Sequence, residues 1–168
     1  MRQDIINVAT KEIGVSEYPP GSNSVKYNDW LYGADYAAKL LPSQKEWCCA
    51  FYSYVRHEAG ASIGKGDFLK GFASVPFFYQ HFKANITTNP QPGDAVIYDW
   101  EMGKPGHVCT DWTPRHIGMF VEWIDKKAGT FYTIEGNTST TNQSNGGMVM
   151  KRQRNLAFVQ AFINPLNL

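Results

Sequence analysis

The chain has 168 residues and a formal net charge of +1, and 43% of its residues are hydrophobic. This length suits one ordinary domain with a substantial core, so we expect a single domain over residues 1–168. The charge is nearly balanced and there is no long basic run, so the sequence predicts no positively charged surface that would attract a polyanion. We therefore expect no nucleic-acid partner. Three cysteines are too few for a disulfide framework and leave at least one thiol free.

The N-terminal segment carries polar residues where a secretory signal would need an apolar run. These residues are Asp4, Asn7, Lys11 and Glu12. No other window approaches the stretch of about 18 consecutive apolar residues that a membrane-spanning helix requires. We therefore expect no signal peptide, no membrane span and no membrane partner.

Helical patterns fill the first part of the chain. Apolar residues recur at helical spacing over residues 5–13, and a second, shorter helix is predicted from Val25. The following segment runs into Pro42, where Ser43 or a neighbour is available as a helix cap. A third helix is predicted over residues 46–60, which read EWCCAFYSYVRHEAG.

From about Ala95 the pattern changes to short runs rich in β-branched and aromatic residues, separated by Gly, Pro and Asn. The runs are AVIYDW, HIGMFVEWI, TFYTIEG and GMVMKRQ. The polar stretch NTSTTNQSNGG from Asn137 is predicted to be a long hairpin loop. Helices followed by strands that look antiparallel predict the α+β class.

Two adjacent cysteines stand at the predicted start of the third helix. On a helical wheel Cys48 lies at the edge of the apolar stripe, whereas Cys49 lies opposite that stripe with Ser53 and Arg56. Unpaired amides and the dipole at a helix N-terminus favour a thiolate, so either cysteine could be reactive. Both could equally be inert core or surface residues. The wheel favours Cys48 only slightly, and Arg56 could support Cys49 electrostatically.

A thiol nucleophile needs a base, and the base needs a third group that orients it. His57 lies on the helix of the thiols and His81 lies in an amphipathic run, so we expect both to be structural. His107 lies in a loop-like segment, whereas His116 opens a predicted strand, from which its ring could reach a neighbouring helix terminus. The two remain the candidates for the base.

Glu135 stands at the end of the next predicted strand, before Gly136 and Asn137. In an antiparallel pair this end would lie beside the start of the strand of His116. An isolated Glu at a strand end is otherwise an ordinary solvated residue.

Residues 47–60 resemble the nucleophile helix of the CHAP family, the cysteine- and histidine-dependent amidohydrolases and peptidases that cut bacterial peptidoglycan, often as bacteriophage endolysins. The Trp-Cys-Ala-x-Phe-Val pattern of that family matches Trp47, Cys48, Phe51 and Tyr52. Its His-hydrophobic-Gly strand, after a Pro-Gly-Asp turn, resembles residues 116–118 after 92–94, and its Ile-Glu-Gly-Asn block resembles 134–137. The flanking segments are also similar, so the resemblance covers nearly the whole chain. The chain differs in having Cys49 where Ala is usual and in a longer segment before His116.

The resemblance implies a papain-like α+β domain, with N-terminal helices packed against a twisted antiparallel sheet. It implies Cys48 as the nucleophile, His116 as the base and later the acid, Glu135 as the group that orients His116, and Asn137 as a further polar contact. The partner would be bacterial peptidoglycan, cut at the N-acetylmuramoyl-L-alanine amide or at a peptide bond of the stem or cross-bridge. A lysin of this kind is made in the host cytoplasm and acts on the cell wall, and we expect a monomer.

Two other functions agree with parts of the sequence. Zinc-ligand residue types occur at Cys48, Cys49, His107, Cys109 and His116, but their spacing fits no closed zinc pattern, so a zinc-dependent hydrolase is the weaker alternative. A non-catalytic wall-binding module would need aromatic grooves, but it would not need Cys, His and Glu blocks in this order.

The cysteine mechanism requires no cofactor. Asp99, Glu101 and Asp111 lie in a loop where some family members carry an acidic cation site. Calcium binding is therefore possible, but we do not predict it, because the regular Asp-x-Asp-x-Asp-Gly spacing is absent.

Overall fold

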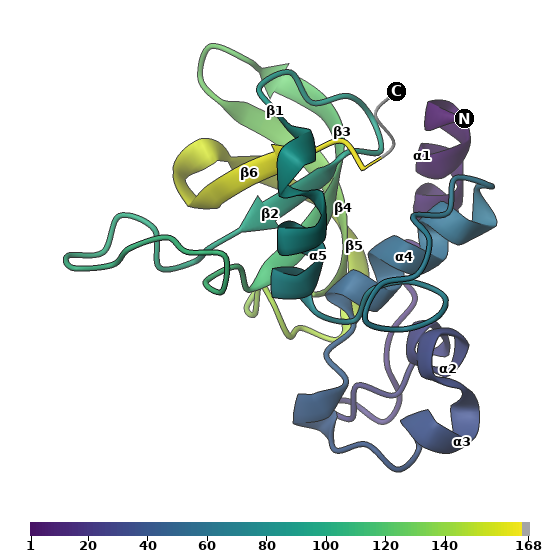
Figure 1. Cartoon of the computed structure of the whole chain (residues 1–168). Coiled ribbons are helices and arrows are strands. Elements are labelled where there is room, and N and C mark those ends of the chain that lie inside the picture. The colour runs from purple at the N-terminus through teal and green to yellow at the C-terminus, as the bar shows by residue number, and fades with distance from the viewer. Residues whose placement is uncertain (166–168) are drawn as a thin grey trace.

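The computed structural model describes residues 1–165. Helices come first and strands follow, as Figure 1 shows. The α-helices are α1 (Arg2–Lys11), α2 (Lys26–Tyr32), α3 (Ala34–Ala37), α4 (Cys48–Glu58) and α5 (Val75–Phe82). The strands are β1 (Ile86–Thr87), β2 (Ala95–Tyr98), β3 (His116–Asp125), β4 (Thr130–Thr138), β5 (Met148–Asn155) and β6 (Val159–Ile163). The predicted α+β class is confirmed.

The strands form one antiparallel sheet in the order β1-β6-β2-β3-β4-β5. The four predicted runs correspond to β2, β3, β4 and β5, and the polar stretch after Asn137 is the loop between β4 and β5. Strand β6 was not predicted. It lies between β1 and β2, so the last described strand is placed inside the sheet rather than at its edge.

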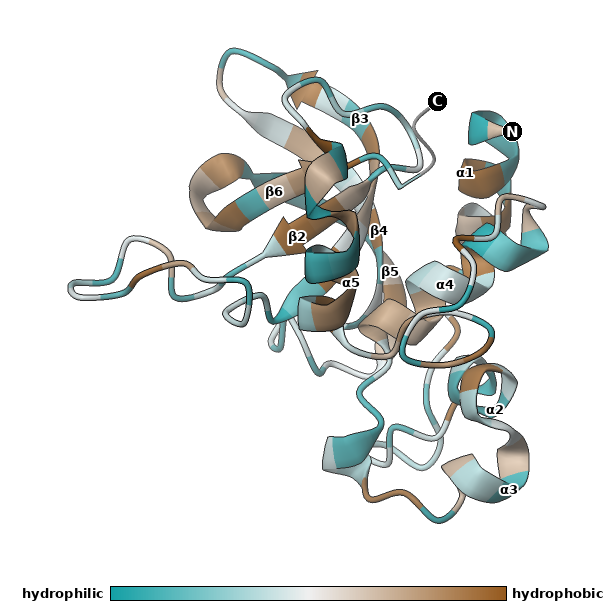
Figure 2. Ribbon diagram, in the orientation of Figure 1, coloured by the Kyte–Doolittle hydropathy of each residue, from teal (hydrophilic) through white to brown (hydrophobic). Residues whose placement is uncertain are grey.

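Side chains of successive strand residues enter two different cores. In β2, Ala95 and Ile97 join the large core between the sheet and the helices, whereas Val96 and Tyr98 join a smaller aromatic core on the other face. Figure 2 shows how hydrophobic residues concentrate on the central strands. Because every residue of this short strand is buried, β2 reads as a continuous apolar run rather than an alternating one.

Helix α4 lies at the centre of the large core and contacts α1, α2, β3 and β4. Cys49, Ser53 and Arg56, which lie opposite its apolar stripe, are buried as well. The Ser53 hydroxyl accepts a hydrogen bond from the Phe72 amide at 3.0 Å, and the Arg56 guanidinium donates to the Gly93 carbonyl at 3.1 Å. Polar side chains are tolerated in this position because backbone groups of neighbouring segments satisfy them.

The first helix ends at Lys11, two residues short of the predicted stripe, and Ile13 is exposed. The segment after Leu41 forms a short 3-10 turn in which the Gln44 side chain accepts from the Leu41 amide at 2.9 Å. Ser43 caps neither this turn nor α4. Within residues 1–165, no helix has both the length and the apolar character needed to cross a bilayer.

Candidate active site

Cys48 is the first residue of α4 and lines a cleft of about 510 Å³. Aromatic residues of the helical half, Tyr32 and Tyr36, form one wall of the cleft, and Pro114 and Arg115 contribute from the segment just before β3. The thiol is 4% exposed, so it meets the cleft at one surface while its helix is anchored in the core. The placement at the edge of the apolar stripe therefore agrees with the structure.

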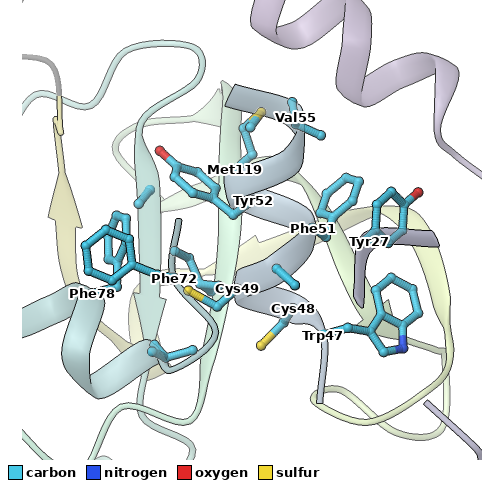
Figure 3. Packing of buried hydrophobic residues seen from close by; sticks show 14 of the residues in the cluster. Tyr27, Trp47, Cys48, Cys49, Phe51, Tyr52, Val55, Phe72, Phe78 and Met119 are labelled. Atoms are coloured by element: carbon cyan, nitrogen blue, oxygen red, sulfur yellow. The ribbon is translucent and has the colours of Figure 1, made fainter. Parts of the chain in front are cut away.

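Cys49 faces a different environment from its neighbour. Figure 3 shows its sulfur directed toward Phe72 and Phe78, away from the sulfur of Cys48. Burial, reinforced by the negative charge that Cys48 would carry as a thiolate, raises the pKa of the Cys49 thiol well above its ordinary value. Cys49 therefore stays protonated and has no route to the cleft, so Cys48 is the thiol available for chemistry.

His116 is the first residue of β3, as predicted, and its side chain is fully buried. Its Nε2 lies 2.9 Å from Oε2 of Glu135. Within the described residues, Nδ1 has no hydrogen bond of regular geometry, yet the Cys48 thiol is close enough to influence the protonation of the ring. Because Nε2 is engaged by Glu135, Nδ1 is the nitrogen left to face the thiol.

The imidazole of His116 is held in its cationic form. Burial alone would lower its pKa, but hydrogen bonding to Cys48 and to Glu135 outweighs that effect and raises the pKa of His116 to about 9. At neutral pH the ring is therefore an imidazolium. An imidazolium beside a cysteine stabilises the thiolate form of that cysteine.

Glu135 lies at the centre of a buried network in which every carboxylate oxygen is satisfied. Its Oε1 accepts from Arg154 Nε at 2.8 Å, Thr133 Oγ1 at 2.5 Å and the Tyr98 hydroxyl at 3.2 Å. Its Oε2 accepts from Arg154 Nη2 at 2.5 Å in addition to His116. The pairing of strands β3 and β4 brings Glu135 beside His116, as the antiparallel arrangement predicted.

The charge on Glu135 is fixed by its partners. Burial would raise its pKa, but the hydrogen bonds and charges of Arg154 and His116 hold the pKa of this carboxyl far below its usual range. Arg154 was not predicted from the sequence. Its place on β5 depends on the register across the long β4–β5 loop, which no local spacing reports.

Close steric contacts explain why glycine occupies two positions in the motifs that resemble the CHAP family. A Cβ on Gly118 would lie 2.9 Å from Cγ of Glu135, so only glycine lets this carboxylate cross β3 toward Tyr98. A Cβ on Gly136 would lie 2.6 Å from Cβ of Phe51, so glycine lets α4 pack directly onto β4. The first glycine makes room for the Glu135 side chain, and the second lets the thiol helix lie close to the strand that carries Glu135.

Asn137 does not join the Cys48–His116–Glu135 group by a hydrogen bond. Its side chain accepts from the Gly147 amide and donates to Oδ1 of Asn145, both at 3.0 Å, and its φ is 56°. These bonds close the loop between β4 and β5. The structure therefore places Asn137 as an organiser of this loop, next to Glu135 in sequence but with other partners.

The remaining histidines lie away from the thiol pair. The His57 ring packs on Trp30, and the His81 ring packs on Phe72 and Phe82. His107 pairs with Asp99, with Nε2 2.7 Å from Oδ2. His116 is therefore the histidine that the fold brings to Cys48.

The candidate metal ligands separate into different places. Cys48 lines the cleft, His116 is fully buried and Cys49 lies in the core away from the cleft, whereas His107 and Cys109 lie in the loop before β3, so the five zinc-ligand types do not form one site. Glu101 pairs with Lys104, and Asp111 pairs with Lys83. Neither acid joins Asp99 in the single group of three potential ligands found within residues 1–165, which is Asp99, His107 and Cys109.

Comparisons of the chain with protein-family models, with curated proteins and with solved structures gave no match.

Proposed function

We propose that this chain is a cysteine-dependent peptidoglycan hydrolase of the CHAP family with a papain-like arrangement of its α+β domain. The observation that supports the proposal is the group formed by Cys48, His116 and Glu135. Three motifs that are far apart in the sequence supply, in that order, a thiol at a helix N-terminus that lines the cleft, a cationic imidazole and a carboxylate, the last two buried behind the thiol.

The cationic imidazole of His116 suits nucleophilic attack on an amide. In its thiolate form, whose charge the imidazolium compensates, Cys48 attacks the carbonyl carbon of the substrate. His116 then gives its proton to the leaving nitrogen, and later takes a proton from the water that hydrolyses the thioester. Glu135 keeps the imidazole oriented and compensates its positive charge.

The start of α4 also offers groups that stabilise the developing oxyanion. The first amide groups of an α-helix have no partner within the helix, and here they lie beside the Cys48 thiol. Such fixed donors stabilise a negatively charged oxygen in the transition state.

The cleft suits a peptide substrate with charged groups. Tyr32, Tyr36 and Phe68 provide aromatic surface, and both signs of charge line the same cleft, from Arg115 and from the acids Glu46 and Asp67. Stem peptides of peptidoglycan carry carboxylates and apolar alanine side chains. Either the muramoyl amide or a peptide bond of the stem or cross-bridge fits this chemistry.

Digestion of purified Gram-positive sacculi tests the proposal. The wild-type chain should release soluble fragments, and the Cys48→Ser variant, which retains the shape of the site, should release none. Mass spectrometry of the new termini identifies the bond: L-alanine amino termini indicate the muramoyl amide, and glycine or D-amino-acid termini indicate a peptide bond. New reducing sugars alone, or wall binding without release, would contradict a cysteine hydrolase.

The biological setting follows from the same proposal. As a lysin of the phage type, the protein would be made in the host cytoplasm and would act on the cell wall as a monomer.

A further inference from the structure

The segment between β2 and β3, residues 99–115, extends away from the sheet and returns to it (Figure 1). Three successive turns reverse its first half, with amide-to-carbonyl bonds from Met102 to Asp99, from Lys104 to Glu101 and from His107 to Lys104. Gly103 and Gly106 have φ values of 80° and 79°, which permit these reversals. The turns bring His107 back over the end of β2.

Three metal-binding side chains meet where the loop returns. Nε2 of His107 is 2.7 Å from Oδ2 of Asp99, and the ligand atoms of Asp99, His107 and Cys109 all lie within 4.8 Å of one another. Asp99 is fully buried, whereas Cys109 is exposed. An ion could therefore reach the cluster from solvent and find a carboxylate already fixed at its base.

Asp99 is held in place by its own backbone neighbourhood. Its amide donates to the Phe158 carbonyl at 3.0 Å, and its Oδ1 accepts from the Glu101 amide at 3.0 Å. Oδ2 is the oxygen that faces His107, and Thr113 also hydrogen-bonds to this carboxylate. A ligand that is oriented in advance loses less conformational freedom when a metal binds.

The loop has little apolar core of its own. Val108 is 71% exposed and Trp112 is 56% exposed. Loops longer than about 12–15 residues without regular structure are uncommon in domains and usually serve a function. The second half of the loop contacts Phe77 of α5 through Trp112, and it contacts Lys83, which follows α5, through Asp111.

We propose that Asp99, His107 and Cys109 form a binding site for a thiophilic divalent cation such as zinc. A thiolate, an imidazole and a carboxylate are the three ligand types that zinc prefers, whereas calcium selects oxygen ligands alone. Three protein ligands leave the fourth tetrahedral position to a water molecule. The site is separate from the cleft and does not depend on the proposed hydrolase activity.

The geometry needs only a small adjustment to accept the ion. With metal–ligand bonds of about 2.0–2.3 Å, ligand atoms in a tetrahedral site stand about 3.3 Å apart. Asp99 and His107 therefore separate by roughly half an ångström, and the ion replaces the hydrogen bond between them. Cys109 reaches the ion by moving with the exposed loop, whose other end supplies Arg115 to the cleft.

Cobalt(II) is the probe, because a cobalt–thiolate bond gives a charge-transfer band in the near ultraviolet that does not depend on activity. The titration is made on the full chain carrying Cys48→Ser, which removes the other thiol that stands beside a histidine. We expect one cobalt ion per chain, a thiolate band, and displacement of the cobalt by zinc. Adding Cys109→Ser or, separately, His107→Ala should abolish the band or weaken binding at least tenfold.

Asp111→Asn is the matched control, because it removes an acid of the same loop outside the cluster and should leave the titration unchanged. Circular dichroism checks that each variant is folded. Absence of a thiolate band in the Cys48→Ser chain would overturn the proposal. A band that persists unchanged after Cys109→Ser, or a band seen only when Cys48 is present, would overturn it equally, since the ion would then lie elsewhere.

Discussion

The buried imidazolium of His116 makes the stability of the protein depend on pH in a defined window. Its pKa is about 9 in the folded chain against an ordinary 6.5. At about 1.4 kcal/mol per pH unit, the difference corresponds to about 3 kcal/mol of stabilisation. Because the folded-state pKa is the higher one, this stabilisation is complete below about pH 6.5 and is lost as the pH rises through about 9.

Urea unfolding at pH 6.0 and at pH 8.5 measures the effect. The free energy of unfolding should fall by about 2 kcal/mol between these values, most of the total, and the fall should disappear in His116→Gln. The range ends at pH 8.5 because the raised pKa of Cys49 adds its own loss of stability above that point. Cys48→Ser should reduce the fall, since the thiol is one of the groups that raise the pKa of His116.

The matched control is His81→Gln, which removes a histidine outside the cleft and should keep the full wild-type fall. A free energy of unfolding that stays constant from pH 6.0 to pH 8.5 would refute the reasoning. So would an equal fall in His116→Gln, because the dependence would then arise from other groups.

Four further predictions concern the same network. Cys48→Ser should abolish release of wall fragments, whereas Cys49→Ser should retain most activity. Cys49→Ser should lose about 1–3 kcal/mol of stability in urea unfolding, because it buries a hydroxyl in an apolar site. Loss of activity in Cys49→Ser alone would reverse the assignment of the nucleophile. His116→Ala should be as inactive as Cys48→Ser in a turbidity assay, and His107→Ala should not. Arg154→Met should lower the free energy of unfolding by about 3–5 kcal/mol, because it leaves the Glu135 carboxylate without its main buried partner, and unchanged stability would contradict that role. Gly118→Ala should cost about 1–3 kcal/mol and reduce kcat, since its new methyl group displaces Glu135, and wild-type kinetics in this variant would show that the contact relaxes freely.

Local patterns in the sequence were sufficient to predict the helix and the strands that carry the residues of the candidate site. The helical spacing over residues 46–60 and the strand runs from Ala95 correspond to α4 and β2 to β5, because periodicity reports burial of one element at a time. The expected meeting of His116 and Glu135 is confirmed for the same reason: adjacent antiparallel strands place the end of one beside the start of the next.

Features that depend on several elements together could not be predicted in this way. A helical wheel assigns a face from residue types, so it could not show that Cys49 and Arg56, opposite the apolar stripe of α4, are buried as well. Arg154 reaches Glu135 only through the register of β5 after a long loop. The meeting of Asp99 with His107 depends on turns whose direction is set by glycines with positive φ, which the sequence permits but does not require.

The burial of the charged network also determines how dissolved salt acts on the protein. Glu135 and His116 are fully buried and Arg154 is nearly so, whereas mobile ions screen charges that solvent reaches, over a distance of about 8 Å at physiological ionic strength. Added salt therefore leaves the protonation of the reaction centre in place. It acts instead on the exposed Arg115 at the cleft and on the Lys83–Asp111 pair. Rising ionic strength should thus change KM for a charged substrate while the pH profile of kcat stays where it is.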